Sequence, residues 1–177
     1  MSNLIAKRYV KALIKDRETQ HVTRINEQLK FISTAYFDEK FLDIINSIDV
    51  TTYKKVDLIL SFLGNNNDYL VNNLIILLGK NRRLDILPAI SNELEKEYSA
   101  IINHYDGIVY SGVVLSSEYM SEMENKFSNK FGVNLTLTNE VCDYDGIKVD
   151  IDSLGVEIGF EKNKFKSQMI EHILKAV

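Results

Sequence analysis

Two helical patterns meet in the stretch Leu77-Leu78-Gly79-Lys80-Asn81-Arg82-Arg83-Leu84-Asp85-Ile86-Leu87-Pro88-Ala89-Ile90. Before it, the chain from Tyr69 to Leu78 is apolar on nearly every side, which predicts a helix inside a bundle. After it, apolar residues recur at helical spacing from about Asp85. Pro88 is tolerated there because the N–H groups of a first turn have no intrahelical acceptor. Arg82 and Arg83 are cations beside the C-terminal end of the helix predicted from Tyr69 to Leu78. The stretch therefore predicts a fixed corner between two packed helices.

Outward from this corner, residues 1–104 predict helices only. Apolar side chains recur at steps of three and four residues, the spacing that places them on one face of a helix. The first four predicted helices carry Ile5, Tyr9 and Leu13; Val22, Ile25, Leu29, Ile32 and Tyr36; Phe41, Ile44, Ile45 and Ile48; and Val56, Ile59, Leu60 and Leu63. Thr51 or Thr52 is expected to cap the fourth helix, and Asp68 the fifth. Short connections favour an antiparallel six-helix bundle.

The pattern changes after Tyr105 from helical to alternating. Strands are predicted at 108–115, 133–141, 147–151 and 156–160, with a helix from Ser116 or Ser117 to Gly132 between the first two. A last helix is expected over 161–177, with Phe165, Met169, Ile173 and Leu174 on one side. The fold class is therefore α+β: a six-helix bundle over residues 1–104 and a small α/β domain with a short sheet and a C-terminal helix over residues 105–177.

Charge and composition restrict the possible functions. The chain has 177 residues, a net charge of −4 and a sequence pI of about 5.4, which argue against non-specific binding to nucleic acid. Residues 1–104 carry 14 basic and 13 acidic side chains, and residues 105–177 carry 7 and 12, so the excess acid lies in the second part. The single Cys142 excludes an internal disulfide framework. Without a signal peptide or a long apolar segment, we expect a soluble intracellular protein.

Catalytic and cofactor motifs are not apparent. His21, His104 and His172 lie in separate elements and share no metal-ligand spacing with Cys142. The acidic group Asp143, Asp145, Asp150 and Asp152 superficially resembles a calcium loop, but Lys148 stands at a ligand position and strands flank the segment. The favoured interpretation is a tight Asp-Gly turn that enters a strand with an acidic outer face. We therefore expect no cofactor and no enzymatic activity.

Two segments resemble the delta subunit family of F-type ATP synthase, which includes the oligomycin-sensitivity-conferring protein. The segment from Ile5 to Leu13 resembles the family's opening ARxYAxAL, and the corner resembles its LLxxNxRLxxLPxI stretch, with Asn81, Arg83 and Pro88 in register. The resemblance extends over the whole chain. The C-terminal part departs from the family, because only Asp145-Gly146 stands where paired glycines are usual and Lys162-Asn163-Lys164 replaces an Asp-Gly-Ser. The sequence therefore resembles a divergent bacterial member.

The resemblance implies a connector in the peripheral stalk, or stator, at the cytoplasmic face of the inner membrane and bound to that membrane only through partners. In the family, the N-terminal bundle holds the N-terminal helix of an alpha subunit, and the C-terminal domain holds the b-type stalk subunits. Such a helix-in-groove contact needs an apolar stripe left over from the bundle core. The candidates on the first and fifth helices are Ala6, Tyr9, Val10, Leu13, Val71, Leu74, Ile75 and Leu78.

Alternatives remain at this stage. The same eight side chains can simply be core residues of the bundle, as apolar stripes on bundle helices usually are. The whole protein can be a helical adaptor unrelated to ATP synthase, or an enzyme with a metal site at the acidic group. The stalk-binding residues of the second domain are not predicted.

Overall fold

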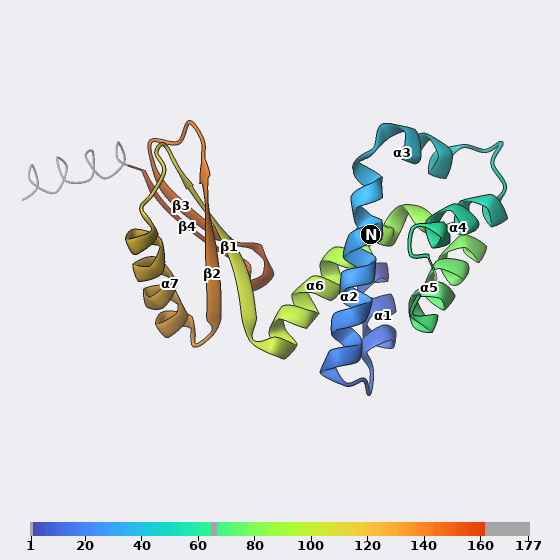
Figure 1. The fold of residues 1–177 in the computed structure, drawn as a ribbon, viewed down its shortest axis with the longest axis horizontal. Helices are drawn as coiled ribbons and strands as arrows, with labels where there is room; N and C mark the ends of the chain where they lie inside the picture. Colours follow the sequence, from blue (N-terminus) through green and yellow to red (C-terminus); the bar gives the residue numbers. More distant parts are fainter. Residues whose placement is uncertain (1, 65–66, 162–177) are drawn as a thin grey trace, which may run out of the picture. The chain divides into compact units, whose positions relative to one another are not determined.

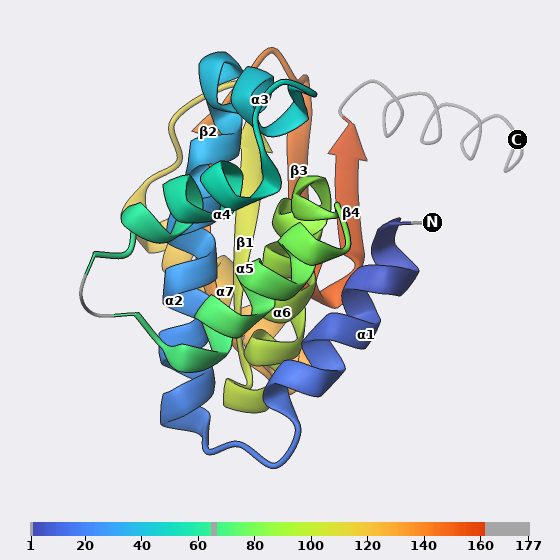
Figure 2. The ribbon, with the colours of Figure 1, turned by 90° about the vertical axis from the view of Figure 1, so that its right-hand side faces the viewer.

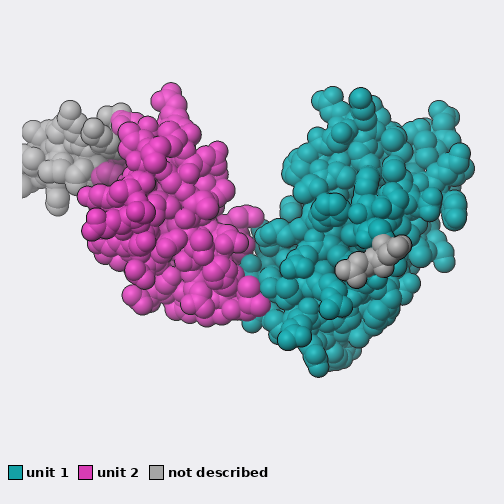
Figure 3. All heavy atoms as spheres, viewed as in Figure 1, with its two compact units in different colours: residues 1–101 teal, residues 102–177 magenta. Residues whose placement is uncertain are grey.

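The chain folds into two units in the computed structural model, which describes residues 2–64 and 67–161. Unit 1 covers Met1–Ile101 and unit 2 covers Ile102–Val177, as the two colours of Figure 3 show. The division falls slightly before the boundary expected at residues 104 and 105. Asn103 adopts a left-handed backbone conformation (φ 51°), which ends the helix of unit 1 and turns the chain into the first strand of unit 2.

Unit 1 is a bundle of six α-helices with two short 3-10 turns (Figures 1 and 2). The α-helices are α1 (Ser2–Ile14), α2 (Thr19–Thr34), α3 (Glu39–Asn46), α4 (Thr52–Ser61), α5 (Tyr69–Lys80) and α6 (Leu87–Ile102). The 3-10 turns are η1 (Ala35–Phe37) and η2 (Leu84–Ile86). The predicted helical unit is confirmed. The expected start of the sixth helix near Asp85 is a 3-10 turn instead, and the α-helix begins just before Pro88.

The core of unit 1 is built from the predicted apolar stripes. Val22, Ile25, Leu29 and Ile32 of α2 are almost completely buried, and α6 buries Leu87, Ile90 and Leu94 against them. Burying a large aliphatic side chain contributes about 1.5–3 kcal/mol, so these stripes are the main source of stability for the bundle. The third predicted stripe was too long, because α3 ends at Asn46 and Ile48 lies beyond it, 99% exposed.

Helix ends follow local sequence signals. Asp68 caps α5, since its carboxylate accepts a hydrogen bond of 2.9 Å from the backbone N–H of Leu70. The same carboxylate lies 2.7 Å from Nε2 of His21, which ties the start of α2 to the start of α5. Thr51 occupies the expected cap position of α4, but its side chain makes no capping hydrogen bond.

Unit 2 contains a four-stranded mixed sheet with one helix packed on it (Figure 1). The elements are β1 (His104–Ser111), α7 (Ser117–Phe131), β2 (Asn134–Val141), β3 (Gly146–Ile151), the 3-10 turn η3 (Asp152–Leu154) and β4 (Val156–Glu161). The strand order is β2-β1-β3-β4: β1 pairs parallel with β2 and antiparallel with β3, and β3 pairs antiparallel with β4. The α+β fold class is confirmed.

The helix α7 begins and ends as the sequence predicts. Ser116 accepts a hydrogen bond from the N–H of Tyr119, and Gly132 closes the helix in the left-handed conformation. Met123 and Phe127 pack against the sheet residues Val109 and Leu135. The expected last helix over 161–177 lies outside the described residues apart from Glu161, which belongs to β4.

The Asp-Gly segment before β3 is not a hairpin turn. Because β1 lies between β2 and β3, residues 142–145 cross over β1 rather than join two paired strands. The crossing is held by a hydrogen bond of 3.0 Å from the N–H of Cys142 to the carbonyl of Ser111. Gly146 is required at its end, because a Cβ there would collide with the backbone of Phe160 on β4.

Candidate partner-binding surface of the helical unit

The predicted stripes on α1 and α5 lie mostly inside the bundle. Seven of the eight candidates are at most 7% exposed and belong to the core of unit 1: Ala6, Val10, Leu13, Val71, Leu74, Ile75 and Leu78. Only Tyr9 is partly exposed. Seven of the side chains are therefore core residues in this structure, which is the alternative that the sequence left open, and their contact with a partner stays a prediction. They are buried because α1 and α5 each turn their most continuous apolar face inward.

A different set of apolar side chains on the same helices faces solvent. On α5, Tyr69, Ile76 and Leu77 are 56%, 38% and 46% exposed, and on α1, Leu4 is 64% exposed. The fifth helix is apolar on both sides, so filling the core does not exhaust its apolar surface. Sequence reasoning identified this surplus on α5 but assigned it to the inward face.

Tyr9 links α1 to the end of α5. Its hydroxyl accepts a hydrogen bond of 3.3 Å from the side-chain amide of Asn81, the residue that follows α5. Residues four apart share one face of a helix, which places the exposed Leu77 beside Asn81. On α1, the exposed Ala12 lies one turn after Tyr9. Exposed apolar side chains of α1 and α5 therefore lie next to the contact between Tyr9 and Asn81.

The corner over residues 81–86 is a fixed element. The N–H of Arg82 bonds to the carbonyl of Gly79 at 2.9 Å, and the N–H of Arg83 bonds to that of Leu78 at 2.8 Å. This pair of bonds is a Schellman motif, in which Arg82 occupies the left-handed position with φ 54°. The carbonyl of Leu84 accepts a hydrogen bond of 2.7 Å from Tyr36. Pro88 is the second residue of α6, where its missing N–H costs nothing.

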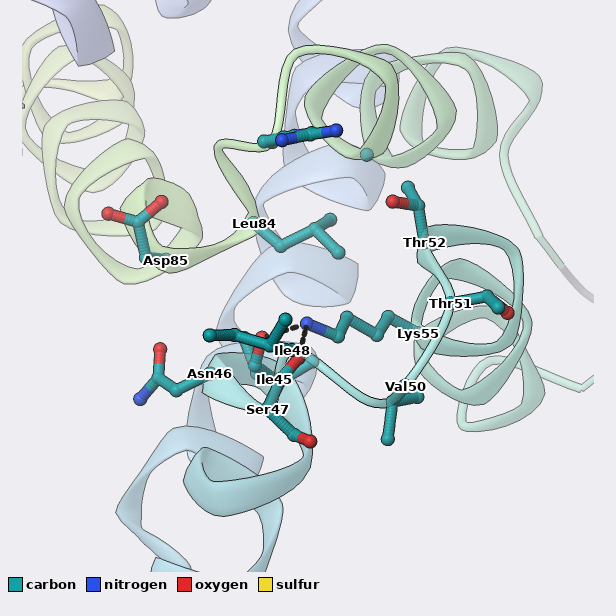
Figure 4. Close-up of a pocket in the computed structure, with 12 residues that line it drawn as sticks. Ile45, Asn46, Ser47, Ile48, Val50, Thr51, Thr52, Lys55, Leu84 and Asp85 are labelled. Carbon is teal, nitrogen blue, oxygen red and sulfur yellow. Dashed lines mark hydrogen bonds between the residues drawn. The ribbon is translucent and has the colours of Figure 1, made fainter.

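Beside the corner is a pocket of about 510 Å³ (Figure 4). It lies between the end of α3, the start of α4 and the corner, and Ile45, Val50 and Leu84 supply part of its apolar lining. Lys55 crosses its wall and donates hydrogen bonds of 2.7 and 2.6 Å to the carbonyls of Ile45 and Ser47, which satisfies the end of α3. The ammonium group of Lys55 therefore stabilises the fold.

Metal chemistry finds no support among the residues that the structure describes, where no group of three or more His, Cys, Asp and Glu side chains is arranged to hold an ion. The acidic residues Asp143 and Asp145 precede β3, whereas Asp150 lies within it and Asp152 follows it. Within residues 2–64 and 67–161, none of the helices has the length and hydropathy needed to cross a bilayer.

Comparison with known proteins decides the family. The family model described as ATP synthase delta (OSCP) subunit matches residues 5–159. The chain belongs to this family. Relatives named ATP synthase subunit delta are 51% identical in Aliarcobacter butzleri and 39% identical in Campylobacter curvus, each over the full length of both chains.

A solved structure supports the fold. A chain of the Toxoplasma gondii mitochondrial ATP synthase hexamer superposes with a TM-score of 0.72 at 18% sequence identity, covering 98% of this chain and 97% of that one. Membership of the delta (OSCP) family makes the protein a non-catalytic stator subunit of F-type ATP synthase, part of a membrane-associated complex. It is not an enzyme by itself, and the interpretation as an unrelated adaptor is set aside.

Proposed function

We propose that this chain joins the catalytic alpha/beta head of the synthase to the b-type subunits of its peripheral stalk, on the cytoplasmic face of the membrane. Unit 1 holds the N-terminal helix of an alpha subunit, and unit 2 holds the stalk. The stalk must resist torque while the rotor turns, so the connector needs a firm contact at each end. The delta (OSCP) family membership supports this assignment of partners.

The observation that carries the first half of the proposal is the contact between Tyr9 and Asn81. It joins two helices whose outer faces carry exposed apolar side chains, with Leu77 on α5 and Ala12 on α1 next to the contact. An amphipathic helix that lies along both faces would bury these side chains, as helix-in-groove complexes do. The small side chain of Ala12 allows the partner's backbone to approach closely.

The buried candidates have a positioning role in this proposal. Val10 and Ile75 are completely buried, so they fix α1 and α5 against the bundle and do not touch the partner. The backbone N–H groups of Asn81 and Arg83 bond to the carbonyls of Leu77 and Leu78 and hold the end of α5, next to which Asn81 meets Tyr9. A rigid groove lowers the ordering cost of binding, which is the physical reason to build it on a well-packed core.

The test is calorimetric titration of the full chain with a peptide that carries the N-terminal residues of the alpha subunit from the same synthase. Leu77→Asp is expected to weaken binding by at least about tenfold, because it places a charge in the contact surface. The matched control is Ile48→Asp, since Ile48 is an exposed apolar residue of unit 1 outside α1 and α5. Equal binding by Leu77→Asp and the wild type would refute the proposed groove.

A second variant separates contact from folding. Ile75→Asp places a carboxylate in the core and is expected to destabilise unit 1 by more than about 3 kcal/mol, with loss of helical circular dichroism. Leu77→Asp is expected to keep the wild-type spectrum, because Leu77 is 46% exposed. If Ile75→Asp stayed folded and lost only peptide binding, the inner stripe and not the outer one would be the contact surface.

A further inference from the structure

We infer that unit 2 binds the stalk through an apolar tip at the end of its parallel strands, and that the stalk segment it accepts is apolar with basic flanks. This deepens the proposed function and rests on it. The tip patch consists of Val113, Val114 and Val141. The three side chains are 66%, 79% and 52% exposed.

These three residues come together because of strand register. Ser111, the last residue of β1, pairs with Val141, the last residue of β2. The loop from β1 to α7 starts directly after Ser111 and contains Val113 and Val114. Tyr119, in the first turn of α7 after this loop, is also 65% exposed. The patch lies at the opposite end of β1 from His104, about 25 Å along the strand.

The loop that carries Val113 and Val114 is held in place by the side chains of Asn139 and Ser111. The amide of Asn139 on β2 donates hydrogen bonds of 2.9 Å to the carbonyl of Val109 and 2.8 Å to the hydroxyl of Ser111, and its oxygen accepts one of 2.9 Å from the N–H of Leu115. The Ser111 hydroxyl in turn donates to the carbonyl of Val113 at 2.7 Å. The loop is therefore pinned before and after its two exposed valines.

An ordered loop with exposed valine side chains is energetically unfavourable in water. Surface loops are ordinarily polar, and clustered apolar side chains at such a place mark interaction surfaces. Valine has a single side-chain torsion, so these residues lose little conformational entropy when a partner orders them. Both properties favour a contact that must be rigid.

Charge specifies the partner. The two segments that form the tip, residues 112–118 and 139–145, contain Glu118, Glu140 and Asp143 among their acidic residues and no lysine or arginine. Acidic residues in the same segments as an apolar patch favour a partner with lysine or arginine beside its apolar residues and disfavour an acidic one. A basic amphipathic helix end of the stalk satisfies both requirements.

The test uses the full chain and two binding assays. Membranes stripped of the catalytic head retain the stalk, so co-sedimentation with them measures stalk binding, and gel filtration with the isolated head measures head binding. Val113→Asp/Val114→Asp is expected to lose at least about tenfold in co-sedimentation with head binding unchanged. The control Asn134→Asp/Thr136→Asp adds the same two charges at exposed positions near the other end of β2 and is expected to sediment like the wild type.

Failure of this inference is distinct from failure of the proposed function. If the wild-type chain does not sediment with the stripped membranes, the stalk role itself is wrong and the tip loses its partner. If the wild type sediments and Val113→Asp/Val114→Asp sediments equally well, the stalk role stands and the tip is not its surface. Equal losses in the variant and the control also refute the tip, because they assign the effect to charge anywhere on the unit.

Two further measurements test the tip without relying on added charge in the patch. Cys142 adjoins Val141 and is the only cysteine in the chain, so its rate of alkylation in the intact synthase, relative to the free chain, reports whether the tip is covered. We expect slower alkylation in the complex, and an unchanged rate would overturn the inference. Glu140→Lys is expected to weaken co-sedimentation, and tighter binding would exclude a basic partner.

Discussion

The phenolic hydroxyl of Tyr36 donates a hydrogen bond of 2.7 Å to the carbonyl oxygen of Leu84. It joins the turn after α2 to the corner that follows α5, across 48 residues of sequence. The Tyr36 ring is buried and meets Phe41 edge-on, with ring centroids 5.0 Å apart. Together with the backbone hydrogen bonds of Arg82 and Arg83 and the buried side chain of Leu84, this contact holds the corner against the bundle core.

Removal of the Tyr36 hydroxyl tests that role. Tyr36→Phe leaves the buried carbonyl of Leu84 without its donor, and we expect a loss of about 1–2 kcal/mol in the free energy of unfolding. Urea denaturation followed by circular dichroism measures it. The control Tyr53→Phe alters a residue that is 78% exposed and should change stability by less than about 0.5 kcal/mol. A neutral effect of Tyr36→Phe would show that water replaces the lost donor.

The same residue predicts a dependence on alkaline pH. Burial, followed by the nearby Asp85 carboxylate, raises the pKa of Tyr36 well above its usual range. Above the ordinary tyrosine pKa of about 10, the unfolded chain releases a proton that the folded chain retains, so the stability from this group is present below pH 10 and falls as pH rises. Wild-type stability should therefore fall more steeply than that of Tyr36→Phe between about pH 9 and 11. Parallel profiles would contradict this.

Gly79 is expected to be required for the packing of α4 against α5. A Cβ at this position would collide with a methyl group of Val56, so Gly79→Ala should destabilise unit 1 by about 1–3 kcal/mol, although alanine is ordinarily the better helix residue. The double variant Gly79→Ala/Val56→Ala removes the collision and should recover part of the loss. Thermal unfolding of the four proteins of this cycle gives the coupling energy, and additive effects would show that the two residues do not meet.

Arg82 and Arg83 are adjacent arginines that differ in backbone conformation, so replacing each by glycine tests the effect of backbone strain. Arg82 has a left-handed backbone (φ 54°), a conformation that costs a side-chain-bearing residue about 1 kcal/mol, so Arg82→Gly should raise the free energy of unfolding by about 0.5–1 kcal/mol. Arg83 has φ −125°, which is not strained. Arg83→Gly should therefore lower the free energy of unfolding, because glycine only adds conformational freedom to the unfolded chain. Destabilisation by Arg82→Gly would show that its side chain, which lines the pocket, contributes more than the strain costs.

Local signals in the sequence predicted the elements well. Asp68 and Ser116 cap helices, and Gly132 ends one, because caps depend on residues within one turn. The stripes of α2 and α6 predicted buried faces because helical periodicity is also local. The first strand was expected at 108–115 but spans His104–Ser111, so it was placed too late at both ends. Residues 104–107 pair with the distant strand β2, which the local pattern does not reveal. Family membership was visible in the corner and in the opening segment.

The assignment of inner and outer faces was not available from the sequence. Leu77 and Leu78 are adjacent and chemically identical, yet Leu77 is 46% exposed and Leu78 is completely buried. A helix that is apolar on both sides carries no signal of which side the neighbouring helices occupy. For that reason the candidates on α5 were placed on the buried face.

By itself, then, the sequence determined two units, a helical bundle and an α+β unit, together with the caps, the corner and the family, because each depends on short-range pattern. Tertiary structure decided which apolar residues remain for partners, that Tyr9 meets Asn81, and that Val113, Val114 and Val141 gather at one tip. Those outcomes depend on strand order and helix packing between residues distant in the chain. Such long-range contacts follow from the sum of many weak interactions, and no single segment of the sequence encodes them.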